Sequence, residues 1–106
     1  MNHSSGKPGA RLHKFTLLTN HAHVLLIIAQ TPDVRMREIA AIIGLTERAV
    51  QRIIDDLTTS GFIIVTKSGR RNRYQISLDH PLDHPVEQGR NLGDLVRFML
   101  PELHAA

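Results

Sequence analysis

Cysteine and tryptophan are absent from the 106-residue chain, and only 4% of its residues are aromatic. The lack of cysteine excludes a disulfide framework, a thiolate zinc site, an iron–sulfur cluster and a cysteine nucleophile. Long hydrophobic runs are also missing, because the longest, Val24 to Ala29, is far shorter than the ~20 residues that cross a bilayer. With no recognisable signal peptide, we expect a cytoplasmic protein with no membrane partner.

The motifs of catalytic sites are missing too. The sequence has no glycine-rich phosphate loop, no Gly-x-Ser-x-Gly motif and no pattern of paired carboxylates. It also has few aromatic side chains that could line a substrate pocket. We therefore expect no enzyme activity and no cofactor.

Positive charge is concentrated in two segments of a chain whose net charge is +3. Residues 1–19 contain three cations and residues 61–78 contain four, and neither segment contains an acid. Residues 79–106, in contrast, carry five acids against two arginines. This segregation indicates an anionic partner such as nucleic acid, although a solvated face also produces charge runs.

The length fits a single domain, which typically has about 50–200 residues. Residues 1–10 form a segment of serine, glycine and proline with no hydrophobic periodicity. We expect a flexible N-terminal tail there, followed by one domain over residues 11–106.

Hydrophobic periodicity predicts three helices before Gly61. The first follows the N-cap residues Thr19 and Asn20 and runs to residue 30, the second covers residues 37–43, and the third, capped by Thr46, covers residues 46–60. The positions expected to face the core are Ile39, Ala40, Ile42 and Ile43 in the second helix and Val50, Ile53, Ile54 and Leu57 in the third.

The hydrophobic period then changes to that of β-strands. Residues 62–66 and 73–78 are rich in β-branched and aromatic residues and flank a polar, glycine-containing turn over residues 67–72, which predicts a hairpin. After a proline-broken loop, Asn91 opens a last helix that Pro101 stops. Its apolar stripe is Leu92, Leu95, Val96, Met99 and Leu100. The expected fold class is α+β and mostly α.

The most specific pattern lies between residues 40 and 53. Ala40, Gly44, Val50 and Ile53 stand at offsets of 0, 4, 10 and 13, the spacing of a helix-turn-helix. They supply a small residue where two helices cross, a left-handed turn residue and two residues that lock the helices together.

Two longer segments carry a resemblance to a known family. They are Thr46-Glu47-Arg48-Ala49-Val50-Gln51-Arg52 and Gly69-Arg70-Arg71-Asn72-Arg73-Tyr74. The chain resembles the winged helix-turn-helix domain of MarR-type and ArsR-type transcription regulators over about residues 15–100. The resemblance implies a three-helix core, a two-stranded β-wing and a C-terminal helix. It also implies sequence-specific binding to double-stranded DNA, with no catalysis.

The third helix is predicted to expose Glu47, Arg48, Gln51, Arg52 and Asp55. The forked side chains of arginine and glutamine match guanine O6/N7 and adenine N6/N7 in the major groove. We expect helix 46–60 to enter that groove by its N-terminal half, with Thr46 also among the contacts. In the alternative, Arg52 pairs with Asp55 or Asp56 on a solvated face.

The predicted hairpin supplies a second basic element. Lys67, Arg70, Arg71 and Arg73 surround its glycine-containing tip, while Tyr74 is expected to pack within the wing. With no acid nearby in the sequence, we expect this basic wing, residues 67–73, to contact phosphates or a narrow minor groove. In the alternative, the cations only protect an edge strand from pairing with other chains.

The start of the second helix departs from related domains, which usually place serine or threonine there as the N-cap. A start at Arg37 would put a cation at the positive end of the helix dipole and leave the cap missing, both unfavourable. A DNA phosphate held by free N–H groups and by Arg35 or Arg37 would explain both features. A helix start misplaced by a residue or two would explain them equally well.

Two other functions compete with DNA binding. A metal-responsive regulator would use Asp79, His80, Asp83 and His84, but nothing in the sequence shows that these ligands converge. Winged helices also serve as non-catalytic protein-interaction modules. The basic wing and the arginines of the third helix favour DNA over both alternatives.

We also expect a homodimer, because one winged helix reads only a few base pairs and a two-fold dimer doubles the contacts. Its half-sites would lie about 10 base pairs apart, or a simple multiple of that. Apolar surface for the interface is expected on the first helix, on its leading residues Leu12, Phe15, Leu17 and Leu18, and on helix 92–100, where Phe98 lies at the edge of the stripe. In the alternative, the last helix only seals the core of its own chain.

Overall fold

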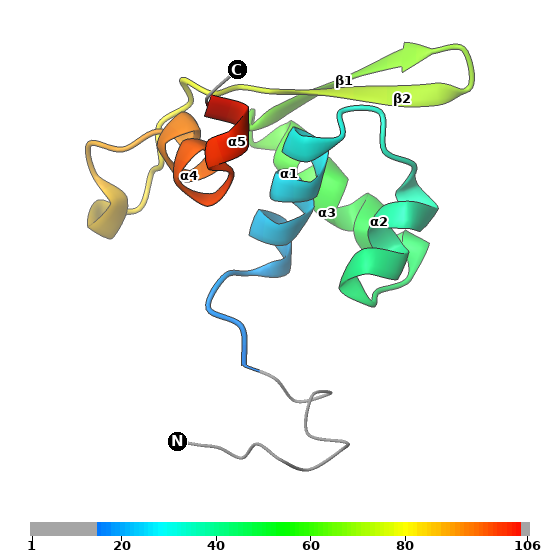
Figure 1. Cartoon of the computed structure of the whole chain (residues 1–106), viewed down its shortest axis with the longest axis horizontal. Helices are drawn as coiled ribbons and strands as arrows, with labels where there is room; N and C mark the ends of the chain where they lie inside the picture. The colour runs from blue at the N-terminus through cyan, green and yellow to red at the C-terminus, as the bar shows by residue number, and fades with distance from the viewer. Residues whose placement is uncertain (1–14, 105–106) are drawn as a thin grey trace.

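The computed structural model describes residues 15–104 and shows three helices, a two-stranded hairpin and a C-terminal helical pair (Figure 1). The elements are α1 (Asn20–Gln30), α2 (Met36–Ile43), α3 (Glu47–Thr59), β1 (Ile63–Ser68), β2 (Arg71–Ile76), the 3-10 helix η2 (Pro85–Glu87), α4 (Leu92–Met99) and α5 (Pro101–His104). This order and the mainly helical α+β class confirm the predicted winged helix. The expected flexible tail over residues 1–10 lies outside the described residues, as does Leu12.

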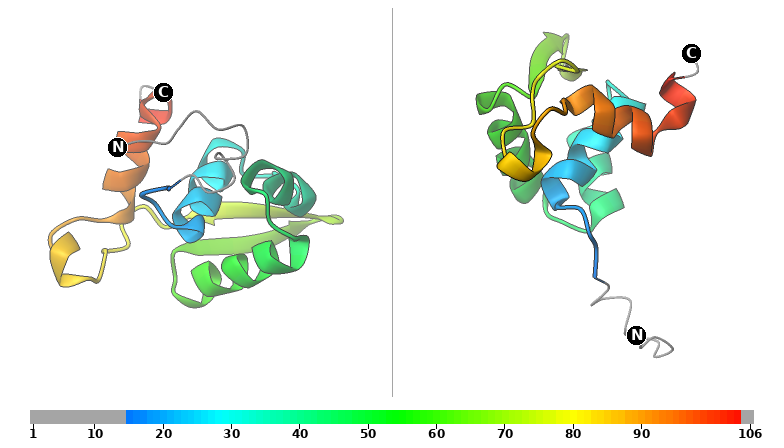
Figure 2. Two further views of the ribbon diagram at one scale, coloured as in Figure 1. Left: turned by 90° about the horizontal axis from the view of Figure 1, so that it is seen from below. Right: turned by 90° about the vertical axis from the view of Figure 1, so that its left-hand side faces the viewer.

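Helices α1, α2 and α3 pack on one another, and the hairpin packs on α1 and α3. Figure 2 shows α3 running alongside the hairpin, with α4 at the other side of the molecule. The core contains hydrophobic residues from every one of these elements, and no charged residue is buried in the described part of the chain. All four residues of the predicted stripe on α3 are buried, which orients the opposite face of that helix to solvent.

Local signals set the helix ends that the sequence predicted. Thr19 Oγ1 accepts a hydrogen bond from the Ala22 N–H at 3.2 Å, and Thr46 Oγ1 accepts one from Ala49 at 3.0 Å. Between α2 and α3, Gly44 has a φ of 76°, a left-handed conformation that glycine adopts without steric cost. These contacts confirm the helix-turn-helix spacing.

The hairpin differs from its prediction. The strands pair from Ile63 with Ile76 to Ser68 with Arg71, so only Gly69 and Arg70 remain in the turn. The predicted six-residue turn was wrong, because the outer part of the hairpin is polar on both faces and the hydrophobic period cannot mark where pairing ends. A φ of 65° at Gly69 permits the tight turn.

One residue of α2 was placed wrongly. Ile39 and Ala40 are buried and Ile43 is half-buried, but Ile42 is 65% exposed. At about 100° per residue, Ile42 falls on the flank of the helix, outside the arc that its three apolar neighbours share.

The C-terminal helix begins as predicted. Asn91 Oδ1 accepts from the Asp94 N–H at 2.9 Å and Asp94 Oδ2 accepts from the Asn91 N–H at 3.0 Å, a reciprocal cap. Leu92, Val96 and Leu100 are buried, whereas Met99 is partly exposed. Pro101 ends α4 but also begins α5, a position where its missing N–H has no cost. None of the helices within residues 15–104 is long and apolar enough to cross a bilayer.

Candidate nucleic-acid interface

The solvent face of α3 carries the polar residues that the sequence placed there. Glu47, Arg48, Gln51, Arg52 and Asp55 are all exposed, as is the cap residue Thr46. The N-terminal half of the face holds both arginines, and Asp55 and Asp56 follow one turn later. The N-terminal half of this face therefore carries two cations and one acid, Glu47, whereas the charged residues of its C-terminal half are all acids.

The acids on α3 have partners other than its arginines. The Gln51 Nε2 group donates to Asp55 Oδ1 at 2.8 Å, and His21 Nε2 of α1 lies 2.8 Å from Asp56 Oδ2. Among residues 15–104, no ion pair involves Arg48 or Arg52. The alternative in which Arg52 pairs with Asp55 or Asp56 is therefore not the arrangement found.

The N-terminus of α2 corrects an expectation. The helix begins at Met36 with Arg35 as N-cap, one residue earlier than predicted, so Glu38 falls at the third helical position. The Arg35 N–H donates to Glu38 Oε1 at 2.8 Å, and the Glu38 carboxylate lies at the positive end of the helix dipole. As expected, the side chain of the N-cap residue accepts no hydrogen bond from the first-turn N–H groups, but Glu38 supplies one half of a capping box. Both arginine side chains, Arg35 and Arg37, remain exposed.

A groove of about 490 Å³ separates the wing from the loop that joins α1 to α2. Asp33 and Arg35 line it on the loop side, and Lys67, Arg70 and Arg71 line it on the wing side. We call this the basic groove. In Figure 1 the wing tip and α2 lie at the same end of the molecule, opposite α4 and α5. The fold therefore gathers four predicted site residues from two distant segments around one concavity.

A family model of the MarR family matches residues 15–73, more than half of the chain. The chain belongs to the MarR family. Members of this family are non-enzymatic regulators of transcription that bind DNA and typically act as dimers. At the level of the family, this chain is a DNA-binding transcription regulator. No curated protein sequence matches it.

One acidic residue in the interface of this MarR-family chain was missed from the sequence. The Arg71 Nη2 atom donates to the backbone oxygen of Asp33 at 2.6 Å and lies 3.8 Å from Asp33 Oδ2. The two residues are 38 positions apart, and no motif in either segment signals the contact.

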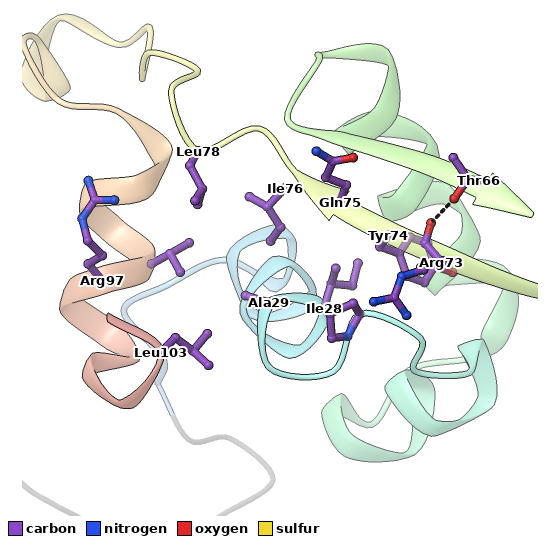
Figure 3. Close-up of a pocket in the computed structure, with 12 residues that line it drawn as sticks. Ile28, Ala29, Thr66, Arg73, Tyr74, Gln75, Ile76, Leu78, Arg97 and Leu103 are labelled. Carbon is purple, nitrogen blue, oxygen red and sulfur yellow. Dashed lines mark hydrogen bonds between the residues drawn. The ribbon is translucent and has the colours of Figure 1, made fainter. Parts of the chain in front are cut away.

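Arg73 does not join the other wing cations. It lines a second groove, of about 650 Å³, between the end of α1, β2 and the C-terminal helices (Figure 3). That groove is largely apolar, with Ile28, Leu78 and Leu103 in its walls and Arg97 of α4 at its other side. The structure therefore splits the predicted basic wing into two surfaces. Tyr74, between them, is buried as expected.

The candidate metal ligands are not brought together. His80 Nδ1 lies 2.8 Å from the Pro81 oxygen, and its ring packs edge-on against Phe62 with centroids 4.6 Å apart. His84 Nδ1 accepts a hydrogen bond from the Val86 N–H at 3.1 Å and so caps η2. Within residues 15–104, no three side chains of the types that bind metal form a cluster, so Asp79 and Asp83 do not complete a site with these histidines.

Proposed function

We propose that this MarR-family chain is a sequence-specific regulator whose segment 46–60 lies in the major groove of double-stranded DNA. The observation that supports it most directly is the pair Arg48 and Arg52, exposed side by side on α3 with no ion-pair partner among residues 15–104. Their guanidinium groups would contact base edges, because a bidentate guanidinium fits guanine in that groove. Thr46 and Glu47 would lie at the end of the helix that enters first.

Gln51 would contribute differently from the arginines. Its amide nitrogen is held by Asp55 at 2.8 Å in the free protein. The second N–H and the oxygen of this amide remain available to a base, but the bond to Asp55 restricts the orientation of the group. Most of the binding free energy from contacts to bases would then come from the two arginines.

The basic wing, residues 67–73, and the N-terminus of α2 would hold the DNA backbone. Lys67 and Arg70 line the basic groove from one side and Arg35 lines it from the other, with Arg37 exposed nearby on α2. The spread of cations around one concavity suits a chain of phosphates better than a single anion. This arrangement favours DNA over a protein-interaction surface.

We also propose a homodimer as the DNA-binding form. Phe98 on the outer side of α4 is 81% exposed, and Phe15 and Leu17 ahead of α1 are even more exposed. The four buried residues of α1 are used by the core of the chain itself, so the interface would rest on α4 and on the leading segment. Two-fold symmetry would make the operator palindromic.

Selection of binding sites from random duplexes, followed by footprinting of the enriched DNA, tests the proposal. A sequence-specific dimer is expected to enrich a palindrome and to protect two half-sites whose centres are about 10 base pairs apart, or a multiple of that. The matched control is Arg48→Ala/Arg52→Ala, which should bind the same pool without enrichment. Equal enrichment by both proteins would contradict the role given to α3.

A further inference from the structure

The wing is attached to the rest of the molecule at two points along β2. At its base, Tyr74 is buried and its N–H donates to the Pro32 oxygen at 2.8 Å. Further out, Arg71 donates to the Asp33 oxygen at 2.6 Å. The second attachment lies three residues closer to the tip, about 10 Å along the strand.

Between Tyr74 and the wing tip, the contact of Arg71 is the one hydrogen bond found in the described residues that connects the wing to another element. The other side-chain hydrogen bonds of the outer wing, from Thr66 to Arg73 and from Asn72 to Tyr74, stay within the hairpin. Among residues 15–104, no further hydrogen bond or ion pair joins residues 66–72 to another element. Within the described residues, Arg71 is therefore the polar contact that ties the outer part of the wing to the α1–α2 loop.

The contact also determines what Arg71 can offer to DNA. Its Nη2 atom is bonded to a backbone oxygen, and the Asp33 carboxylate lies close to the same atom. A phosphate would have to compete with both groups for the guanidinium. Arg70 lies next to it in the turn, is exposed, and has no hydrogen bond or ion pair to any described residue.

We infer that Arg71 is a positioning residue that fixes the width of the basic groove and does not itself bind a phosphate. It joins the outer wing to Asp33, and so holds Lys67 and Arg70 at a set distance from Arg35 across the groove. This inference rests on the proposed binding of DNA and assigns different roles to the two adjacent arginines of the wing. Arg70 binds a phosphate, whereas Arg71 holds the wing in the orientation in which it binds DNA.

The first arm of the test uses the free protein and the pair Arg71→Ala and Arg70→Ala. Each removes one exposed arginine of the wing, and the positions are adjacent. Amide hydrogen exchange of residues 66–72, followed by NMR, should accelerate about threefold to fivefold in Arg71→Ala, the size expected for losing a partly exposed charged hydrogen bond. In Arg70→Ala, exchange should match that of the unaltered protein.

The second arm measures DNA affinity at several salt concentrations. Arg70→Ala should reduce the slope of log affinity against log salt by about one, because one phosphate contact is lost. Arg71→Ala should weaken binding about threefold at every salt concentration and leave the slope unchanged, because only the population of the binding-competent wing falls. A role in overall stability alone would not produce this split between affinity and slope.

Two results would overturn the inference. One is unchanged exchange in Arg71→Ala, which would show that the contact does not hold the wing. The other is a slope reduced by about one in Arg71→Ala, which would make Arg71 a phosphate ligand like Arg70. If the unaltered protein fails to bind duplex DNA, the proposed function fails, and the exchange rates still decide whether Arg71 anchors the wing.

Discussion

Arg48 and Arg52 have no ion-pair partner among residues 15–104, unlike the two aspartates further along α3, which are bonded to other side chains. Gln51 is bonded to Asp55 and His21 to Asp56, whereas no ion pair within residues 15–104 includes either arginine. Since a guanidinium is charged at any physiological pH, an unpaired one on a helix surface keeps all its donors for an external ligand. These two residues therefore carry the sequence selectivity that we propose.

Replacing either arginine tests this at the level of single side chains. Arg48→Ala or Arg52→Ala should cost about 1–3 kcal/mol on the selected site and little on random duplex, because a base contact is lost. Fluorescence anisotropy titrations with both duplexes measure the difference. Thr59→Ala, an exposed change at the far end of the same helix, is the control. A loss of equal size on both duplexes would show that the arginines contact only the backbone.

At the level of the elements, α3 was the most predictable part of the fold. Its N-cap, its buried stripe and the glycine that follows it are all signals within one short segment, and its bounds of Glu47–Thr59 agree with the predicted ones to a residue at each end. The start of α2 was less predictable, because its N-cap residue is an arginine with no side-chain cap and the contact that marks the start comes from Glu38 inside the helix. The ends of β1 and β2 were missed because their outer halves have no buried face.

The candidate interface was predictable only in part. Sequence periodicity identified the exposed face of α3, since burial of one face determines the other. The basic groove was not predictable, because it joins the α1–α2 loop to the wing across 38 residues through a contact to a backbone oxygen. No pattern in the sequence indicated that Arg73 lines the second groove, because that groove also forms only in the folded chain.

The cap of α4 gives this element a pH dependence. The pKa of Asp94 is lowered from 3.8, mainly because the Asn91 N–H donates to its carboxylate, with Arg97 and Arg90 acting in the same direction and desolvation opposing them. A lowered pKa in the folded state means that the ionised carboxylate stabilises the fold. That contribution is complete above the unfolded pKa of about 3.9 and is lost as the pH falls through the lower folded value.

Urea unfolding at several pH values, for the unaltered protein and Asp94→Asn, tests this expectation. The asparagine still offers an oxygen to the Asn91 N–H but cannot ionise. The unaltered protein should be the more stable of the two at neutral pH, and the difference should shrink as the pH falls from about 5 toward 2. A difference that stays constant over this range would mean that the charge of Asp94 does not stabilise the cap.

On the scale of the whole molecule, apolar surface remains uncovered in the described chain. Phe98 is 81% exposed, Phe15 86% and Leu17 88%, although large aromatic and aliphatic residues usually become buried in a fold or an interface. Phe98 lies on the side of α4 away from Leu92 and Val96, so the core of its own chain does not use it. A second copy of the chain is the partner that we propose for this surface.

Sedimentation at micromolar concentration decides whether Phe98 belongs to a dimer interface. The unaltered protein should sediment as a dimer, and Phe98→Glu should sediment as a monomer of half that mass, because a carboxylate in an apolar interface remains unpaired. The control is Val86→Glu, the same kind of change at a residue that is 86% exposed in η2, outside the proposed interface. A monomer for both the unaltered protein and Phe98→Glu would show that α4 only completes the core of its own chain.

Affinity for the selected duplex across a series of salt concentrations tests most directly whether the exposed cations of α3, the wing and the start of α2 bind DNA. If a dimer contacts about 6–8 phosphates, the slope of log affinity against log salt should be about −5 to −7. Affinity should therefore fall steeply as salt rises, on random duplex as well as on the selected one. Affinity that does not change with salt would contradict the assignment of these surfaces to DNA.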